Sequence, residues 1–294
     1  MPTAGLITAF STSASPDAKQ SQAGSYEAEE CSCVSSLLPS RNVSFGEEGA
    51  DSDAEAEHSL SVLSIDTVHG LLGSARYHTS SGAPKARVDA RVAGTGLAPW
   101  EIHRPQKFVL RLVARHAFSG RVLDAGCGIG DNALYLAKAC PEVEVTAVDV
   151  VPRCLSFVRA KAEIRGMQEK VQLVAASVTE AEPTRLPPPL CNEGCFDTVL
   201  DSSCFHCFGD EPRRRYLANL RRWLRPGGVL HLHCMHEDER RPGGARRVPL
   251  PELLSCFNTE AWWQVECVED STEELHPTFW GGQAKARLLT IRRL

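Results

Sequence analysis

Three glycines at alternate positions, Gly126, Gly128 and Gly130, constrain the fold of this 294-residue chain more than any other feature. They follow a short apolar run, 121–124, and lead directly into a segment with apolar residues at helical spacing, 131–139. Glycine lets a backbone turn tightly and approach a ligand closely. The pattern therefore predicts a strand, a ligand-binding loop and a helix in succession, with a cofactor at the loop.

Apolar runs alternate with helical segments from about residue 118 onward, which is typical of a parallel sheet covered on both faces. Strands are expected at 121–124, 143–149, 171–175, 196–201 and 229–234. Helices are expected at 131–139, 152–165 and 211–224. Two later runs, 262–268 and 284–291, are expected to pair like a hairpin and close the sheet edge. Together they predict an α/β protein with a doubly wound, mostly parallel sheet of seven strands.

The N-terminal part of the chain has a different composition. Residues 1–80 hold three Lys or Arg against eleven Asp or Glu, a net charge of −8, which leaves +3 for the rest. Segments so rich in Ser, Ala, Gly and acids bury too little apolar area to offset chain entropy. We expect a disordered tail over 1–82, with one apolar run at 60–72 that suits a short amphipathic helix, and a folded domain over 89–294. The near-neutral domain gives no electrostatic case for nucleic-acid binding.

The sequence shows no sign of membrane insertion or secretion. It lacks an apolar stretch of roughly 18 to 20 residues, and no basic start precedes an apolar core. The 12 cysteines follow no repeating spacing, which favours a reducing compartment over a disulfide framework. We expect a cytoplasmic protein. An organelle stays open because the first 25 residues are rich in Ser and Thr.

Acidic residues around the glycine loop indicate which cofactor it binds. Asp124 precedes the loop and Asp131 follows it, and both would repel a pyrophosphate at the helix N-terminus. These two carboxylates argue against a nicotinamide oxidoreductase. They are compatible with a cofactor that has a cationic sulfonium and no phosphate. Asp149, nineteen residues beyond Gly130, is placed to accept hydrogen bonds from both ribose hydroxyls.

Five motifs carry a resemblance to a known family: 98–106, 123–130, 148–150, 196–201 and 224–228. With them, residues 89–294 resemble a class I S-adenosylmethionine-dependent methyltransferase. The resemblance is greatest to the small-molecule branch that includes thiopurine, halide or thiol, and tellurite-resistance methyltransferases. It implies a Rossmann-like fold, S-adenosyl-L-methionine as cofactor and a small-molecule methyl acceptor.

The same resemblance implies a role for each motif residue. Asp124 and the loop backbone would hold the methionine moiety, Asp149 would hold the ribose, and Val150 would also bind the cofactor. Asp201 would face the cofactor's amino group or the transferring methyl, and Trp100 would cover the pocket as part of a lid. Ser177 stands where the family commonly has an Asp that reads the adenine amino group. The loop residues so implied are Gly126, Cys127, Gly128 and Gly130.

Methyl transfer from a sulfonium is an in-line displacement, which requires alignment and exclusion of water. A thiolate, halide or metalloid acceptor needs no base, whereas an alcohol or phenol would, and His206 is the candidate base.

A second hypothesis is a catalytically silent domain that binds S-adenosylmethionine as an interaction module. We expect no metal site, because the Cys and His residues at 204–207 and 231–236 lack paired zinc spacing. Nothing in the sequence indicates the oligomeric state.

Overall fold

The computed structural model describes residues 93–294. The predicted tail 1–82, its apolar run at 60–72 and residues 89–92 of the predicted domain lie outside the described residues.

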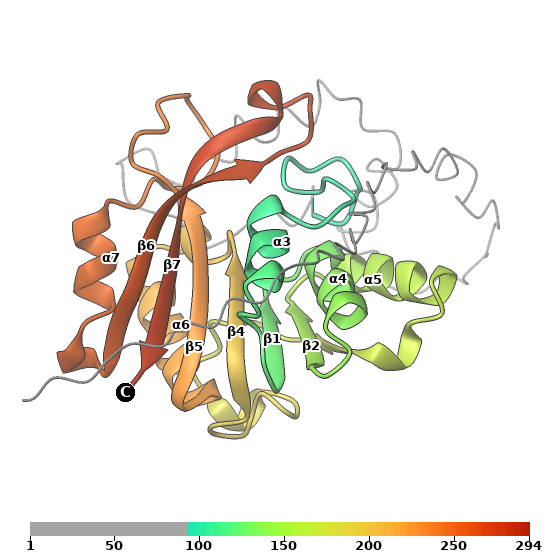
Figure 1. The fold of residues 1–294 in the computed structure, drawn as a ribbon, viewed down its shortest axis with the longest axis horizontal. Coiled ribbons are helices and arrows are strands. Elements are labelled where there is room, and N and C mark those ends of the chain that lie inside the picture. Colours follow the sequence, from blue (N-terminus) through green and yellow to red (C-terminus); the bar gives the residue numbers. More distant parts are fainter. Residues whose placement is uncertain (1–92) are drawn as a thin grey trace, which may run out of the picture. The chain divides into compact units, whose positions relative to one another are not determined.

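Seven strands and a set of flanking helices make up the described chain (Figure 1). The strands are β1 (Arg121–Ala125), β2 (Glu144–Asp149), β3 (Val171–Ala175), β4 (Phe196–Ser202), β5 (Leu224–Met235), β6 (Trp263–Glu274) and β7 (Gln283–Arg293). The α-helices are α3 (Lys107–Ala114), α4 (Asp131–Ala139), α5 (Pro152–Ile164), α6 (Asp210–Trp223) and α7 (Leu250–Cys256). Short 3-10 helices are η2 (Gln168–Lys170), η3 (Pro183–Arg185), η4 (Phe205–Cys207), η5 (Thr259–Ala261) and η6 (Trp280–Gly282).

The strands form one sheet in the order β3-β2-β1-β4-β5-β7-β6. Neighbours from β3 to β5 are parallel, whereas β7 is antiparallel to both β5 and β6. The expected mostly parallel sheet and its closing pair of strands are confirmed. Strand order reverses between β1 and β4, and open α/β sheets bind ligands at such a switch point.

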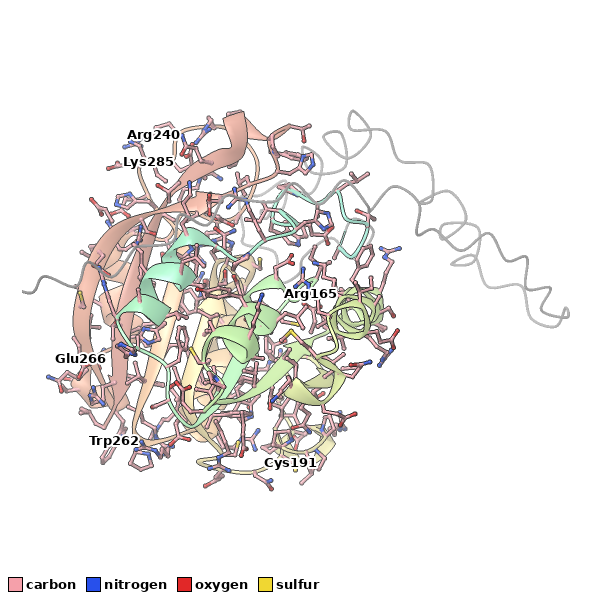
Figure 2. The ribbon with its side chains drawn as sticks, turned by 45° about the vertical axis from the view of Figure 1, so that its right-hand side comes forward. Arg165, Cys191, Arg240, Trp262, Glu266 and Lys285 are labelled. Atoms are coloured by element: carbon pink, nitrogen blue, oxygen red, sulfur yellow. The ribbon has the colours of Figure 1, made fainter. Side chains whose placement is uncertain are left out.

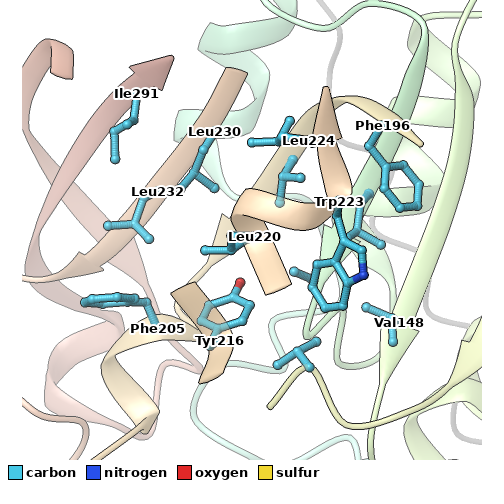
Figure 3. Packing of buried hydrophobic residues seen from close by; sticks show 14 of the residues in the cluster. Val148, Phe196, Phe205, Tyr216, Leu220, Trp223, Leu224, Leu230, Leu232 and Ile291 are labelled. Carbon is cyan, nitrogen blue, oxygen red and sulfur yellow. The ribbon is translucent and has the colours of Figure 1, made fainter. Parts of the chain in front are cut away.

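Each face of the sheet packs against its own helices. Side chains on one face, among them Val122, pack with α3, α4 and α5, and those on the other, among them Leu123, pack with α6 and α7. Figure 3 shows Trp223 and Leu220 of α6 within this second cluster. The Trp223 indole N–H donates to the Leu190 carbonyl at 2.8 Å, so the buried ring leaves no polar group unpaired.

The antiparallel strands β6 and β7 are longer than expected. The predicted strand 262–268 stops too early, because β6 continues to Glu274. Lys285 of β7 pairs with Thr272 at the far end of β6, away from Trp262 and Glu266 (Figure 2). The extra residues carry the end of β6 to the sheet edge at which β5 also ends. No helix within residues 93–294 has the length and apolarity needed to cross a membrane.

Candidate functional site

A cavity of about 520 Å³ opens beyond the carboxyl ends of β1, β2 and β4, the upper end of these strands in Figure 1. Its wall brings together nearly all of the predicted site residues. These are Trp100, Asp124, Gly126, Cys127, Gly128, Gly130, Asp149, Val150, Ser177 and His206. Among the predicted residues only Asp201 is not part of the wall.

The glycine loop takes a conformation that suits no other residue type equally well. Gly126, Gly128 and Gly130 have φ values of 73°, 54° and 78°, all in the left-handed region. A Cβ on Gly130 would lie 2.5 Å from the Val158 side chain. A Cβ on Gly128 would have 3.9 Å to its nearest neighbour, Trp100, so this glycine borders open space. The loop backbone is therefore accessible at Gly128 and tightly packed at Gly130.

Asp149 is fixed by the loop that it faces. Its Oδ2 accepts a hydrogen bond from the Gly128 amide at 2.8 Å, and its Oδ1 accepts one from the Val151 amide at 2.8 Å. Burial raises the pKa of Asp149, and these backbone amides oppose the rise. Each carboxylate oxygen keeps a second lone pair, which suits the two hydroxyls of a ribose.

Asp124 is the acid of the cavity wall whose carboxylate oxygens have the fewest hydrogen bonds. Its side chain is 1% exposed, and neither carboxylate oxygen has a hydrogen-bond partner among residues 93–294. Burial, together with the charges of Asp201 and Asp149, raises the pKa of Asp124 to about 7, against the smaller effect of the nearby Ala133 amide. Unpaired buried carboxylates are costly, and an ammonium or sulfonium group would relieve that cost. The residues present thus fit a cationic, phosphate-free cofactor such as S-adenosylmethionine.

Asp131 contributes less to this electrostatic argument than its position suggested. Its carboxylate forms an ion pair of 2.7 Å with Lys161, whose ammonium also donates to the Ile129 carbonyl at 3.1 Å. Because Lys161 neutralises much of the Asp131 charge, the case against a pyrophosphate rests on Asp124.

Asp201 occupies a supporting position behind the cavity wall. Its carboxylate accepts hydrogen bonds from the Cys204 amide at 2.8 Å, the Phe205 amide at 3.1 Å and the Tyr216 hydroxyl at 2.8 Å. Burial raises the pKa of Asp201 to about 6, against the effect of these donors. With its oxygens committed in this way, Asp201 shapes the turn that follows β4.

His206 lies in the wall with one ring nitrogen occupied. Its Nδ1 accepts the Met235 amide at 3.0 Å, which places the single proton of the neutral ring on Nε2. Burial, with the charges of Arg247 and Arg213, lowers the pKa of His206 to about 3. A neutral imidazole has one lone pair, and here a backbone N–H already uses it. The ring has no free lone pair with which to take a proton.

The segment that contains Trp100 is fastened to the end of β6. Gln106 exchanges two hydrogen bonds with the backbone of Glu274, at 2.8 and 2.9 Å. Buried Glu101 accepts the amides of Gly94 and Ala98 and so folds this segment back on itself. These contacts hold Trp100 beside Gly128 in the cavity wall.

A second loop, residues 242–245, also forms part of the cavity wall, together with Trp280. The Arg247 guanidinium donates to the carbonyls of Glu239, Arg241, Gly243 and Ala245. Its charge also lies over the Trp280 ring at 5.4 Å. Trp280 carries no local motif, so the sequence did not predict its place in this wall.

Sequence reasoning also missed a buried acid, Glu273, at the end of β6. Its side chain lines the cavity, and its Oε2 has no hydrogen-bond partner within the described chain. The sequence gives little indication of this site, because residues 271–274 are all polar and such a run is typical of an exposed segment.

The histidines of β5 pack in the interior. His233 stacks on Phe108 with ring centroids 4.0 Å apart, and its Nε2 lies 3.1 Å from the Ser271 hydroxyl. His231 contacts the edge of the Phe118 ring. In residues 93–294, no group of three or more His, Cys, Asp or Glu side chains is arranged to hold a metal ion.

The chain resembles known methyltransferases in sequence. Residues 122–228 match the family model described as a methyltransferase domain. A curated relative, 2-heptyl-1-hydroxyquinolin-4(1H)-one methyltransferase of Mycobacteroides abscessus, is 34% identical over 170 residues, which cover 57% of this chain and 69% of the relative. The S-adenosyl-L-methionine-dependent Diels-Alderase iccD of Talaromyces variabilis is 34% identical over 141 residues, 47% of this chain and 44% of that protein. Two demethylmenaquinone methyltransferases are likewise matched over less than half of their length.

A solved structure supports the same assignment. It is described as "Conversion of a Disulfide Bond into a Thioacetal Group during Echinomycin Biosynthesis" and superposes with a TM-score of 0.56 at 28% identity. The match covers 66% of this chain and 84% of that one. With the glycine loop, the cavity acids and the coverage of the first relative, these findings identify S-adenosylmethionine as the cofactor. The chain belongs to the family of S-adenosylmethionine-dependent methyltransferases.

Proposed function

We propose that this protein transfers the methyl group of S-adenosylmethionine to a small, mostly apolar organic acceptor. The observation that carries this proposal is the unpaired, buried carboxylate of Asp124 beside the open backbone of Gly128. A cation that bears a ribose would satisfy Asp124 and Asp149 at once.

We assign the cofactor contacts as follows. Asp124 would hold the amino group of the methionine moiety, Asp149 the ribose hydroxyls, and Ser177 the adenine. Exposed Val150 would cover one face of the adenine ring. When bound, the cofactor supplies an electrophilic methyl group on a sulfonium. The protein's part is to align the acceptor with that carbon and exclude water, and Trp100 and Trp280 border the cavity at positions suited to it.

The acceptor side of the cavity is apolar. A cluster of side chains from the ends of β5, β6 and β7 and the neighbouring loops forms it. Its wall members include Met235, Ala245, Leu275 and Phe279. Such a wall favours an uncharged organic molecule over a free halide or oxyanion, so thiols and hydroxyl compounds are the best candidates in the small-molecule branch. The relative that acts on a hydroxyquinolone agrees with this choice.

A second candidate is a protein that binds S-adenosylmethionine without transferring its methyl group. It is favoured by the similarity to a Diels-Alderase described as dependent on that cofactor. In this case the protein would bind the cofactor and release no S-adenosylhomocysteine.

The test is a screen for S-adenosylhomocysteine release with hydroxyquinolones, phenols, aliphatic and aromatic thiols, halides and metalloid oxyanions. Asp124→Ala is the negative control, and Glu266→Gln, on the exposed outer part of β6, is the matched control. We expect release with at least one uncharged hydroxyl or thiol compound, lost in Asp124→Ala and kept in Glu266→Gln. Binding of the cofactor with no release across the panel would contradict the proposal and support the second candidate.

A further inference from the structure

Glu273 is the penultimate residue of β6, and its carboxyl group lies within the cavity wall. The side chain is 3% exposed. Leu275, two residues further along the chain, and Met235, at the end of β5, line the same cavity and belong to the apolar cluster of the acceptor side. The group thus belongs to the same cavity wall as the apolar side chains assigned to the acceptor side.

The hydrogen bonding of Glu273 leaves one oxygen free. The Ser203 hydroxyl bonds to the carboxyl group, whereas Oε2 has no partner within residues 93–294. Ser203 itself has a φ of 71°, an unusual value for a residue other than glycine, and its amide donates to the His233 carbonyl at 2.9 Å. Backbone strain of this kind clusters at functional sites and persists where the surroundings impose it. Here it presents the Ser203 hydroxyl to Glu273.

The surroundings keep Glu273 near its midpoint of ionisation at neutral pH. Burial raises its pKa to about 7, and the Ser203 hydroxyl and the Arg247 charge oppose the rise. The charge of Glu273 also contributes to the raised pKa of the Cys234 thiol of β5, and burial is the main reason that this thiol stays neutral. A base with a pKa near the working pH is the most effective in proton transfer.

His206 and the other acids of the cavity wall have other roles. His206 has no free lone pair, and Asp149 holds the glycine loop. Asp124 faces the end of the cavity assigned to the cofactor. Glu273 is the remaining acid of the wall with an unpartnered oxygen.

We propose that Glu273 is the proton acceptor of the reaction and that the methyl acceptor is a neutral molecule with an ionisable O–H or S–H group. The inference rests on the proposed function. As the acceptor's oxygen or sulfur bonds to the methyl carbon, the carbon–sulfur bond of the sulfonium breaks and its electron pair stays on sulfur. The proton of the O–H or S–H group passes to Oε2 of Glu273. Solvent takes this proton after the product leaves.

The experiment compares wild type with Glu273→Gln and Glu273→Asp, and Glu266→Gln serves as the control on the same strand. Cofactor binding is measured by calorimetry. S-adenosylhomocysteine release is measured from pH 6 to 9 with a 2-alkyl-1-hydroxyquinolin-4(1H)-one, a phenol and thiophenol. The infrared band of protonated carboxyl groups, followed without cofactor, gives a readout that does not depend on activity.

We expect Glu273→Gln to bind S-adenosylmethionine within about twofold of wild type and to lose roughly 100-fold or more in turnover of the phenol. At saturating cofactor, so that the pH dependence of binding through Asp124 does not contribute, the rise of the wild-type rate around pH 7 should be absent from this variant. Thiophenol, largely ionised at pH 8, should lose less. The carboxyl band that titrates near pH 7 should lose the Glu273 contribution in Glu273→Gln, keep the contribution of Asp124, and stay at full intensity in Glu266→Gln. Removal of a buried acid should not lower the melting temperature, and Glu273→Asp should keep part of the rate.

Two failures are distinguishable. If wild type is active and Glu273→Gln keeps its rate within about threefold with the same pH profile, the role of Glu273 is rejected and the proposed function stands. If wild type binds the cofactor and methylates none of the probes, the proposed function is rejected and the proton transfer falls with it.

Discussion

Asp124 and Asp149 border one cavity from the ends of adjacent parallel strands, yet only Asp149 is hydrogen-bonded within the described chain. The backbone of Asp124 pairs with Ala147, two residues before Asp149. Backbone amides of the protein therefore hold the Asp149 carboxylate in place. The Asp124 carboxylate has no such hydrogen bond within residues 93–294, and a bound ligand can supply one.

Asp124→Asn should raise the stability of the cofactor-free protein at pH 8. The pKa of Asp124 is raised to about 7 in the folded protein. Between the ordinary pKa of an aspartate in the unfolded chain and pH 7, the folded protein therefore holds a proton that the unfolded chain has lost. The free energy of unfolding therefore falls as pH rises over this range, and the penalty is complete above pH 7. The asparagine variant should gain roughly 1 kcal/mol or more at pH 8, about 2–4 °C in melting temperature, and little at pH 4. A variant that melts below wild type at both pH values would contradict this expectation.

Binding of S-adenosylmethionine should weaken as pH falls below 7. The cation favours ionised Asp124, so at low pH a proton must leave before the cofactor binds. Calorimetry from pH 8 to 5.5 should show affinity falling by up to about tenfold per unit below the pKa of Asp124, with proton release. Asp124→Asn should bind more weakly at pH 8 and lack this dependence. An equally steep pH profile in the variant would assign the effect to another group.

Gly128→Ala and Gly130→Ala should separate binding from stability. At Gly130 an added Cβ would lie 2.5 Å from Val158, and with the left-handed φ this should cost roughly 2–4 kcal/mol of stability. At Gly128 the space is open, so only the backbone cost of about 1–2 kcal/mol remains. Gly128→Ala should therefore stay folded and lose cofactor affinity, because its methyl group enters the cavity. Urea unfolding and calorimetry measure the two effects, and equal destabilisation by both substitutions would refute the assignment.

Tyr216→Phe should destabilise the protein without changing cofactor affinity. The substitution removes the hydroxyl that donates to buried Asp201 at 2.8 Å, at a cost of about 1–3 kcal/mol when Asp201 is ionised. The pKa of Asp201 is about 6, so the loss should be larger at pH 8 than at pH 5, where the carboxyl is mostly protonated. Tyr135→Phe in α4 is the control. A marked loss of cofactor binding in Tyr216→Phe would show that Asp201 acts in the cavity.

The sequence by itself determined those features of this protein that depend on residues close together along the chain. Strand, loop and helix around Gly126, Gly128 and Gly130 follow from contiguous residues, and Asp149 follows because parallel strands end at one edge of a sheet. That Asp124 lies beside it in the same cavity is a consequence of the same rule.

Tertiary structure alone decided which acids are free to act. Asp201 is engaged by Tyr216 and the turn after β4, and His206 by the Met235 amide, through contacts that no motif encodes. Glu273 reaches the cavity because β6 pairs with β7 for several residues beyond the apolar pattern. The ionisation and free lone pairs of a side chain depend on the groups folded against it, and these come from distant parts of the chain.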